Sequence, residues 1–495
     1  MAQYCLSEFL GLRLKIFSLI CLLGWGGPTY LKAEIWPPES ESVEEDYRNG
    51  VQARLSSNIV QTVDGVGPLR KDRLAFFQSQ TFTIPISKAK PFLTFSPSVL
   101  LNEYKEEEFK MQARFSPDGQ TWGEWQAVRQ AHDLRADSNL FVGNLLYLDT
   151  SVHFFEYLVE FSVPTQGIST TLLKKIRFNF FSPGDVTPVV IDPSSYNEMP
   201  TKDGSCNCPE PAFASRTDWN CPDGQNPSCS NPVSTTVSHL IVHHSAGTNS
   251  SSNWAATVLS IWQFHTTPSP SGSGFCDIGY NWLIDPNGTI YEGRGGGDNI
   301  RGAHFCGTNT GTMGVCLLGN FESATPTQAA LNSLKMLLAW KGCKESLSPA
   351  DTTFHSASSK NLPVVSGHRN GCATACPGEN LFAALQTMGA DVQTEIDNCS
   401  QVASIDPNQD LFQVQVFPNP SQGELQLIWE GKGGSLMTVE CFTGTGVRVW
   451  ESVFRSFPGK NEQQLKLPAK LPQGMYFLKL SDEERMTSQR FLLMD

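Results

Sequence analysis

The chain has 495 residues, which is too long for one ordinary hydrophobic core and predicts about three domains. Hydrophobic residues make up 40% of the chain and charged residues 17%, a composition that indicates a globular protein and excludes a disordered one. The formal net charge of −13 argues against nucleic acid as a partner, because phosphate binding requires a basic surface, and 14 cysteines indicate an oxidising compartment.

Residues 1–33 have the pattern of a signal peptide. Arg13 and Lys15 precede the apolar run 16–23, which is too short to span a bilayer but suits the core of a signal peptide. An uncleaved membrane anchor is the alternative, and the length of the run disfavours it. Because no later stretch is apolar enough to cross a bilayer, we expect an exported protein without a transmembrane anchor.

Residues 34–185 are expected to form an N-terminal all-β sandwich that serves as an accessory domain. Apolar and polar side chains alternate in 155–161 and again in 176–180, which is the period of half-buried strands. Trp122 and Trp125 leave two interpretations open, because exposed rings would stack on sugars whereas buried rings would belong to the core or to an interface. We favour the second interpretation, since nothing in the sequence marks these residues as surface residues.

Residues 186–206 are rich in Pro, Ser and Asn and predict a linker into the next domain. Four cysteines at the end of this linker and just after it indicate either disulfides or a second zinc site. They are Cys206, Cys208, Cys221 and Cys229. Their spacing fits no usual zinc ribbon and an exported protein favours disulfides, so we predict disulfides here.

Residues 207–400 alternate between strand and helix patterns, which predicts a central α/β domain with a mixed sheet and flanking helices. The apolar run 240–242 predicts a buried strand that continues into His243 and His244. Side chains alternate between the two faces of a strand, so one of these histidines can face a cleft while the other packs inside. His265 lies on the apolar face of a predicted helix, where a hydrogen-bonded core histidine is the usual interpretation.

His243, His368 and Cys376 can supply two imidazoles and one thiolate to a zinc ion. Three protein ligands leave the fourth tetrahedral position open for water, which is the pattern of a catalytic site, whereas a structural site would be closed by a fourth side chain. Cys376 as half of a disulfide is the alternative. Cys372, four positions earlier, is the more natural disulfide residue.

The connectivity of the remaining cysteines cannot be deduced from the sequence alone. Cys306 and Cys316 flank a short segment between predicted strands and form a plausible pair. Cys441 stands alone in the last domain, and we expect it to be unpaired.

Several short motifs of the central domain occur in a characteristic order. They are 215–219, 242–246, 276–284, 290–295, 302–304, 318–321, 367–369 and 376–378. With this ordered set the chain resembles the peptidoglycan recognition protein family, the type-2 N-acetylmuramoyl-L-alanine amidases, over roughly residues 207–398. The resemblance implies the family's α/β fold and a zinc enzyme that hydrolyses the amide bond between N-acetylmuramic acid and L-alanine in bacterial peptidoglycan.

The same resemblance implies roles for the residues of the site. Zn²⁺ would be held by His243, His368 and Cys376. Tyr280, in the family's Gly-Tyr-Asn motif, would donate a hydrogen bond to the oxyanion of the tetrahedral intermediate. A strand tyrosine with a buried ring is the alternative. Thr374 stands two positions before the cysteine ligand, where some members carry a lysine, and its hydroxyl would orient the water or a substrate oxygen.

Four further residues are expected to bind the substrate. The resemblance implies that His265 borders the substrate groove. It also implies that His304 lies beside the metal, where an imidazole would bind the peptide stem or shuttle a proton. Arg294 and Asn309 are further candidates for the groove.

Two other functions remain open for this domain. A recognition module would bind peptidoglycan without cutting it, and a zinc peptidase would cut the stem peptide. Non-catalytic members of the family have generally lost the cysteine ligand, whereas Cys376 and Tyr280 are both present here, so we favour the amidase. The motifs around the metal ligands do not fit a peptidase.

Residues 401–411 form a short polar connection to the last domain, 412–495. The segments 417–423, 443–446 and 471–480 are spaced as in a small immunoglobulin-like β-sandwich. They resemble the C-terminal sorting domain of the type IX secretion system of gram-negative bacteria. The resemblance implies passage through the periplasm to the cell surface or the medium, with the type IX machinery as a partner. An ordinary immunoglobulin-like module is the alternative, and we expect the exported enzyme to be a monomer.

Overall fold

The computed structural model describes residues 38–494 apart from several short gaps. The gaps are 50–52, 71–72, 86–91, 132–138, 150, 163–170, 193–194, 197–207, 226–228, 230–231, 403–413, 432–435, 444–447, 469 and 483–485. The predicted signal peptide lies outside the described residues, as do Cys206 and most of the two predicted linkers. In the described part of the chain, no helix is both long enough and apolar enough to cross a membrane.

Among its described residues, the region 39–182 contains strands and one short 3-10 helix, Tyr47–Asn49, which confirms its all-β character. One sheet has the order β10-β7-β13-β4-β3, with β1 on β13 and β11 on β7, and the other has the order β2-β5-β12-β8-β9, with β6 on β12. Both sheets contribute to one apolar cluster, in which Phe95 and Phe178 of the first meet Phe155 of the second. The strands are β1 (Glu39–Asp46), β2 (Ala53–Ser57), β3 (Ile59–Thr62), β4 (Gly65–Pro68), β5 (Ala75–Ser79), β6 (Phe82–Thr83), β7 (Thr94–Leu101), β8 (Phe109–Ser116), β9 (Gln126–Val128), β10 (Leu140–Val142), β11 (Leu146–Tyr147), β12 (Phe154–Phe161) and β13 (Leu173–Ser182).

Trp122 and Trp125 lie between β8 and β9 and are half-buried rather than enclosed in the core. The guanidinium carbon of Arg114 lies 4.8 Å from the ring centre of Trp122 and 4.6 Å from that of Trp125. Arg114 in turn pairs with the buried carboxylate of Glu156 at 2.6 Å. Cation–π stacking on a fixed guanidinium therefore holds both rings. Of the favoured interpretation, core or interface residues, the core part was wrong, and the interface part stays a prediction.

The central sheet is mixed, as predicted, and has the order β16-β15-β17-β14-β20. Its parallel strands are β15 (Trp282–Ile284), β17 (Thr312–Leu317), β14 (His239–His244) and β20 (Val365–Gly367), while β16 (Ile290–Glu292) pairs antiparallel to β15. The register sets His243 beside Cys316 and Val242 beside Gly367. A separate two-stranded sheet contains β18 (Thr352–His355) and β19 (Lys360–Pro363).

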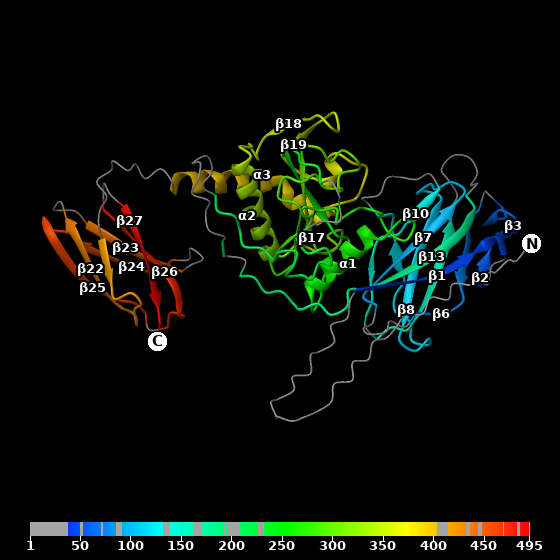
Figure 1. The fold of residues 1–495 in the computed structure, drawn as a ribbon, viewed down its shortest axis with the longest axis horizontal. Helices are drawn as coiled ribbons and strands as arrows, with labels where there is room; N and C mark the ends of the chain where they lie inside the picture. Colours follow the sequence, from blue (N-terminus) through cyan, green and yellow to red (C-terminus); the bar gives the residue numbers. More distant parts are fainter. Residues whose placement is uncertain are drawn as a thin grey trace, which may run out of the picture. The chain divides into compact units, whose positions relative to one another are not determined.

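Three α-helices flank the central sheet in the described residues: α1 (Trp254–Thr266), α2 (Gln328–Lys344) and α3 (Glu379–Val402). Helices α2 and α3 share an apolar cluster with Val242 and Val315, whereas α1 packs with Leu283 and Cys316. Because Val315 and Cys316 are consecutive residues of β17, their side chains point to opposite faces of the sheet. Figure 1 shows the label of β17 between those of α2 and α1. Side-chain caps begin α1 and α2, because Asn253 accepts a hydrogen bond from Ala256 and Thr327 accepts one from Ala330. The sheet is therefore covered on both faces, and only its strand ends are available for a site.

Three disulfides join described residues of the central region: Cys208–Cys399, Cys229–Cys276 and Cys306–Cys372. The expected pair of Cys306 with Cys316 was wrong. Cys316 is buried in the central strand β17, whereas Cys306 is exposed in a loop and bonds to Cys372. Cys441 is unpaired, as expected. Cys208 and Cys229 form disulfides as predicted, but Cys221 is unpaired, so the predicted disulfide was wrong for that residue.

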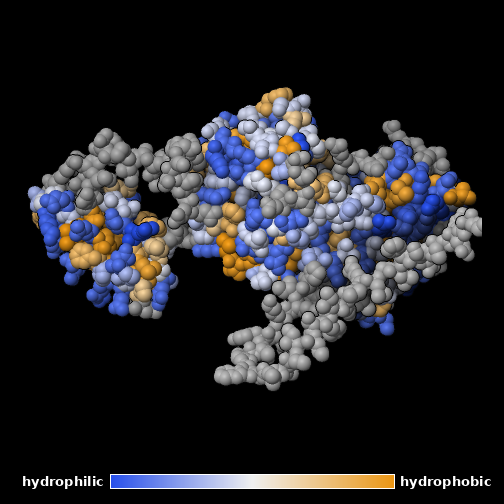
Figure 2. Space-filling model, viewed as in Figure 1, coloured by the Kyte–Doolittle hydropathy of each residue, from blue (hydrophilic) through white to orange (hydrophobic). Residues whose placement is uncertain are grey.

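The C-terminal strands form a three-stranded sheet, β21-β22-β25, and a four-stranded sheet, β24-β23-β26-β27. One apolar cluster includes residues of both sheets, such as Leu427 and Leu478. Figure 2 shows hydrophobic residues at the surface of these strands, where Leu436, Met475 and Phe477 are exposed. The strands are β21 (Val414–Phe417), β22 (Glu424–Gly431), β23 (Leu436–Thr443), β24 (Arg448–Arg455), β25 (Gly459–Lys466), β26 (Gly474–Ser481) and β27 (Met486–Leu493).

Candidate metal centre and adjoining groove

Three potential metal ligands meet at the carboxyl end of the central sheet. His243 lies near the end of β14, and His368 directly follows the neighbouring parallel strand β20 in a short 3-10 helix, His368–Asn370. The register that sets Val242 beside Gly367 therefore carries the next two residues into contact, and the imidazole centres lie 4.5 Å apart. Cys376 approaches from the loop before α3, and all three side chains are buried.

The geometry of this group suits a metal ion. One ligand atom from each of His243, His368 and Cys376 lies within 4.8 Å of the others. Cys376 Sγ is 3.7 Å from His243 Nδ1. With bond lengths of about 2.3 Å to sulfur and about 2.0–2.1 Å to nitrogen, a tetrahedral zinc ion holds two such atoms about 3.6 Å apart. Two imidazoles and one thiolate at this spacing fit Zn²⁺ in both chemistry and size.

A second grouping of metal-binding side chains in the described residues does not compete with this one. Cys306, His368 and Cys372 also lie close together. The two cysteines are joined in a disulfide, so their sulfurs are not thiolates and cannot act as zinc ligands.

The other histidine of the pair points to the opposite face of the sheet. His244 Nδ1 accepts a hydrogen bond from the backbone N–H of Phe321 at 3.3 Å, and the side chain is buried. This confirms the prediction from strand alternation that the two histidines face opposite sides of the sheet.

Tyr280 lies beside the candidate metal centre. Its ring centre is 5.2 Å from that of His243 and 5.5 Å from that of His265. The backbone holds it there, because the carbonyl of Tyr280 accepts from the N–H of Arg294 at 2.8 Å and the preceding Gly279 N–H donates to His265 Nδ1 at 3.0 Å. The phenol is therefore on a segment tied down on both sides.

His265 is almost fully buried on α1. Burial, with a smaller contribution from the charge of Arg294, lowers the pKa of His265 to about 3, so the ring is neutral at physiological pH. Because Nδ1 accepts from Gly279, the ring proton is on Nε2. His265 thus supports the segment that carries Tyr280.

Thr374 is half-buried in the loop before Cys376, and its Oγ1 accepts the backbone N–H of Cys376 at 3.1 Å. A second contact steadies the same loop, since Arg369 N–H donates to the Cys376 carbonyl at 3.0 Å. These hydrogen bonds hold the backbone of the thiolate ligand. The hydroxyl proton of Thr374 is not used in the bond with Cys376.

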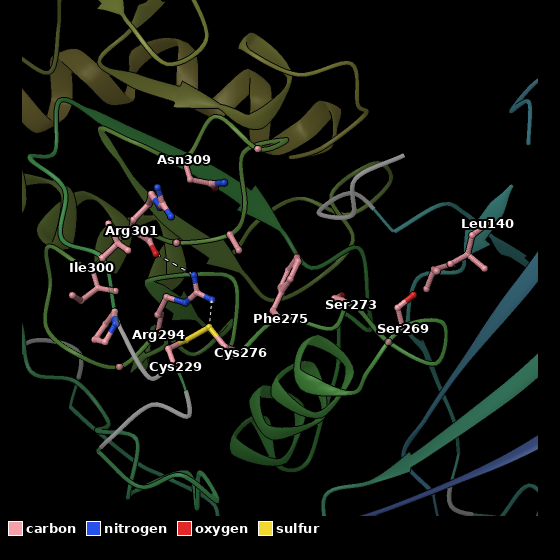
Figure 3. Close-up of a pocket in the computed structure, with 18 of the residues that line it drawn as sticks. Leu140, Cys229, Ser269, Ser273, Phe275, Cys276, Arg294, Ile300, Arg301 and Asn309 are labelled. Carbon is pink, nitrogen blue, oxygen red and sulfur yellow. Dashed lines mark hydrogen bonds between the residues drawn. A yellow bond between two sulfur atoms is a disulfide. The ribbon is translucent and has the colours of Figure 1, made fainter. Parts of the chain in front are cut away.

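A groove of about 510 Å³ is lined largely by loops of the central domain (Figure 3). Among its lining residues are Phe275, Arg294, Arg301 and Asn309. Of the four residues predicted to bind substrate, Arg294 and Asn309 therefore line this groove. His265 and His304 are not among its lining residues, and the side chains of both are buried.

Arg294 is fixed by contacts to its own loop and to a disulfide. Nη1 donates to the carbonyl of Arg301 at 3.1 Å, and Nη2 lies 3.8 Å from Sγ of Cys276, which is bonded to Cys229 (Figure 3). Burial lowers the pKa of Arg294 from its usual range, but the guanidinium stays charged. The groove thus carries a fixed positive charge.

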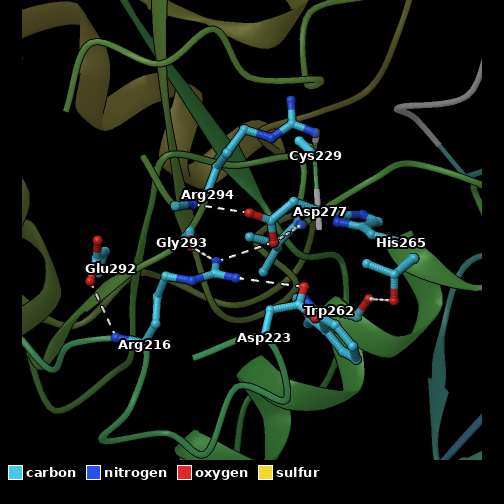
Figure 4. Close-up of polar contacts among 12 residues, drawn as sticks. Arg216, Asp223, Cys229, Trp262, His265, Asp277, Glu292, Gly293 and Arg294 are labelled. Atoms are coloured by element: carbon cyan, nitrogen blue, oxygen red, sulfur yellow. Dashed lines mark hydrogen bonds and ion pairs between the residues drawn. The ribbon is translucent and has the colours of Figure 1, made fainter. Parts of the chain in front are cut away.

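A buried ion pair beneath this loop had no role in the sequence analysis. Arg216 Nη1 donates to Asp277 Oδ1 at 3.1 Å, and both side chains are fully buried (Figure 4). Asp277 Oδ2 also accepts the backbone N–H of Gly295 at 3.0 Å, and Arg216 Nε donates to the carbonyl of Gly224 at 2.8 Å. A sequence feature that could have indicated this ion pair is the presence of Arg216 in the motif 215–219 and of Asp277 in the motif 276–284.

Comparison with known proteins gives two family matches. Residues 233–379 match the family described as "N-acetylmuramoyl-L-alanine amidase", and residues 415–494 match the family described as "Secretion system C-terminal sorting domain". Both agree with the resemblances found in the sequence.

Individual relatives cover the central region. Peptidoglycan-recognition protein SC2 of Drosophila simulans is 31% identical over 175 residues, which are 35% of this chain and 85% of that protein. The N-acetylmuramoyl-L-alanine amidase of Homo sapiens is 33% identical over 133 residues, 27% of this chain and 20% of that protein. Among solved structures, "Drosophila PGRP-LB wild-type" matches at 28% identity with a TM-score of 0.29, covering 36% of this chain and 93% of that chain.

Proposed function

This chain belongs to the peptidoglycan recognition protein family, and we propose that it is a zinc-dependent N-acetylmuramoyl-L-alanine amidase. Its reaction would be hydrolysis of the amide bond between N-acetylmuramic acid and L-alanine in bacterial peptidoglycan. The observation that carries the proposal is the buried group of His243, His368 and Cys376, whose ligand atoms lie within 4.8 Å of one another. A family member that only binds peptidoglycan has no need of a complete ligand set with an open fourth position.

The three ligands would hold Zn²⁺ through two nitrogens and one sulfur. When bound, zinc lowers the pKa of a water in its fourth position to about 7 and polarises a carbonyl oxygen. Thr374 keeps the backbone of Cys376 in place and can turn its hydroxyl proton toward a substrate oxygen.

Tyr280 is proposed as the donor to the oxyanion. A phenol is protonated at neutral pH and can donate a hydrogen bond to a carbonyl oxygen as that oxygen gains negative charge. Support comes from its ring, 5.2 Å from the ring of His243, and from the backbone hydrogen bonds that fix its segment. A donor fixed before the reaction does not have to reorganise in the transition state.

The groove is proposed to bind the rest of the muropeptide. Arg294 and Arg301 offer guanidinium groups, which suit the carboxylates of a stem peptide, and Phe275 offers an apolar face. Asn309 lines the same groove, although its side-chain oxygen already accepts the N–H groups of His304 and Phe305. The resemblance implies that His265 and His304 bind substrate, but the substrate would then have to reach buried rings. We therefore propose supporting roles for these two histidines.

The other parts of the chain would deliver the enzyme. We propose that residues 1–33 are a signal peptide, 34–185 an accessory domain, 207–400 the amidase domain and 412–495 a type IX sorting domain. The match of 415–494 to a secretion system C-terminal sorting domain supports a route through the periplasm of a gram-negative bacterium to its surface or medium. The exported enzyme would act as a monomer.

Digestion of purified peptidoglycan tests the activity. Mass analysis should show a new free amine on L-alanine, whereas a recognition module yields no product and a zinc peptidase cuts within the stem. Cys376→Ser should lose nearly all turnover, because a serine hydroxyl is a poor zinc ligand at neutral pH. The matched control is Cys441→Ser, which makes the same substitution at a buried thiol in the apolar cluster of the C-terminal strands. Equal activity in both variants would refute the proposed site.

A further inference from the structure

His304 lies behind the metal-ligand candidate His243 and not in the groove. Its side chain is fully buried, and its Nδ1 is 3.0 Å from Nε2 of His243. The two rings are nearly perpendicular, with an interplanar angle of 85° and centres 5.0 Å apart. His304 is thus placed to hydrogen-bond with the ring edge of His243 that faces away from Cys376.

The two nitrogens of His243 face different partners. Nδ1 is 3.7 Å from Cys376 Sγ, on the side of the metal site, and Nε2 faces His304. A neutral imidazole carries one proton, and a nitrogen that binds a metal must be bare. If Nδ1 is the ligand, the proton is on Nε2 and is donated to Nδ1 of His304. We propose that His304 is a positioning residue that fixes the tautomer and the orientation of His243 so that Nδ1 faces the metal.

The hydrogen bonds beyond His304 run in one consistent direction. Because Nδ1 of His304 accepts, its proton is on Nε2, which faces Oγ1 of Thr312 at 3.4 Å. Thr312 Oγ1 donates to the carbonyl oxygen of Asn309 at 2.8 Å and keeps a lone pair for His304. A carbonyl has no proton to return, so the chain of donors ends there. The shorter of the two Thr312 contacts is the one to the carbonyl, which favours this direction over its reverse.

The fold also reserves space for the His304 ring. A Cβ atom on Gly314, in the central strand β17, would lie 2.5–2.6 Å from three atoms of that ring. A Cβ on Gly302 would lie 2.5 Å from its Cδ2. Glycine weakens the interior of a strand and often marks a close approach, and here the group that approaches is this imidazole.

The backbone of His304 is fixed as firmly as its ring. Asn309 Oδ1 accepts the N–H of His304 at 2.7 Å and that of Phe305 at 2.8 Å. Metal-binding histidines usually donate their second ring N–H to a carboxylate, a carbonyl or water, and loss of that partner weakens metal binding. In this chain a second neutral histidine takes that place. The inference rests on the proposed function, since a metal ion at Nδ1 is what makes the tautomer of His243 matter.

Zinc affinity of the full chain, measured by competition with a chelator, tests the proposal. His304→Phe keeps a planar ring and removes the acceptor, so the zinc dissociation constant should rise by about 10–100-fold. His304→Asn places an amide oxygen near the position of Nδ1 and should restore most of the loss. Gly314→Ala leaves the imidazole in the chain but crowds it, and should shift affinity in the same direction as His304→Phe.

The matched control is His355→Phe. His355 is equally buried, and its Nε2 lies 2.8 Å from the carbonyl of Thr310, but it makes no contact with His243 in the described hydrogen-bond network. Its zinc affinity should stay within about twofold of the wild type, because no partner of a ligand is lost. Proton–nitrogen NMR spectra of zinc-loaded wild-type protein should show His243 protonated at Nε2.

The outcomes separate the two proposals. Wild-type zinc affinity in a folded His304→Phe variant, or a His243 protonated at Nδ1, would overturn the inference. A wild type that binds zinc without cutting peptidoglycan would refute the amidase proposal and leave the role of His304 standing. A wild type that binds no zinc would overturn both.

Discussion

Removal of the carboxylate of Asp277 should strongly destabilise the central α/β domain, although Asp277 lies outside the candidate metal centre. Asp277 pairs with Arg216, and both side chains are fully buried. In Asp277→Leu the guanidinium keeps its hydrogen bonds to backbone carbonyls, among them that of Gly224, but loses its only fully buried counter-charge among the described residues. The N–H groups of Ile278 and Gly295 also lose their acceptor.

The size of this effect follows from burial. Removing one partner of a buried ion pair typically costs about 3–5 kcal/mol, because a charge is left buried without compensation. The double variant Arg216→Met with Asp277→Leu removes that charge. It should therefore lose less stability than the sum of the single variants by about 1–3 kcal/mol.

Hydrogen exchange read by mass spectrometry is the suitable assay, because each peptide reports on its own part of a multidomain chain. In Asp277→Leu, the protected amides of β14 and β17 should exchange faster than in the wild type, which reports the loss of stability. The control is Lys335→Ala, which breaks a partly exposed 2.9 Å ion pair between α2 and α3 and should cost less than about 1 kcal/mol. Equal effects in the two variants, or strict additivity in the double variant, would refute the reasoning.

Three further predictions concern catalysis, pH and export. Tyr280→Phe should lower turnover by about 10²–10³-fold with zinc content unchanged, because only a donor is removed; a wild-type rate would exclude Tyr280 from the mechanism. His265 has a folded pKa of about 3 against an ordinary value of 6.5. Between pH 6.5 and about 3 the unfolded chain binds a proton at His265 that the folded protein does not bind. The free energy of unfolding is therefore unaffected by this group above pH 6.5 and falls by about 1.4 kcal/mol per pH unit as the pH drops toward 3. In urea unfolding of the metal-free protein, the free energy of unfolding should fall less steeply with decreasing pH in His265→Gln than in the wild type. Equal slopes in the two proteins would contradict this prediction. Deletion of residues 412–495 should leave an active amidase in vitro, because these residues form an apolar cluster of their own. In the native cell, fractionation should show that the truncated enzyme collects in the periplasm. Unchanged export would contradict the sorting role.

Several properties of the site could be predicted because they depend on neighbouring residues alone. Strand alternation is enough to separate His243 from His244, and the structure confirms that they face opposite sides of the sheet. The three candidate ligands were identified from residue types whose chemistry suits zinc and from the resemblance to a known family.

Other features depended on which loops meet once the sheet has formed. Cys306 bonds to Cys372 and not to Cys316, because Cys316 is enclosed in a central strand. Arg216 and Asp277 are 61 positions apart in the chain, and no periodicity links them.

The sequence by itself thus determined the β-rich character of the chain, the order of its motifs and the set of side chains able to bind a metal. Only the tertiary structure decided how those side chains are supported. His304 and His243 are also separated by 61 positions, and they meet because Gly314 leaves room for one ring beside the other on the sheet. The physical reason is one of range: backbone sterics and side-chain period act over a few residues, whereas a buried polar group takes its partner from whatever the folded chain brings within about 3 Å of it.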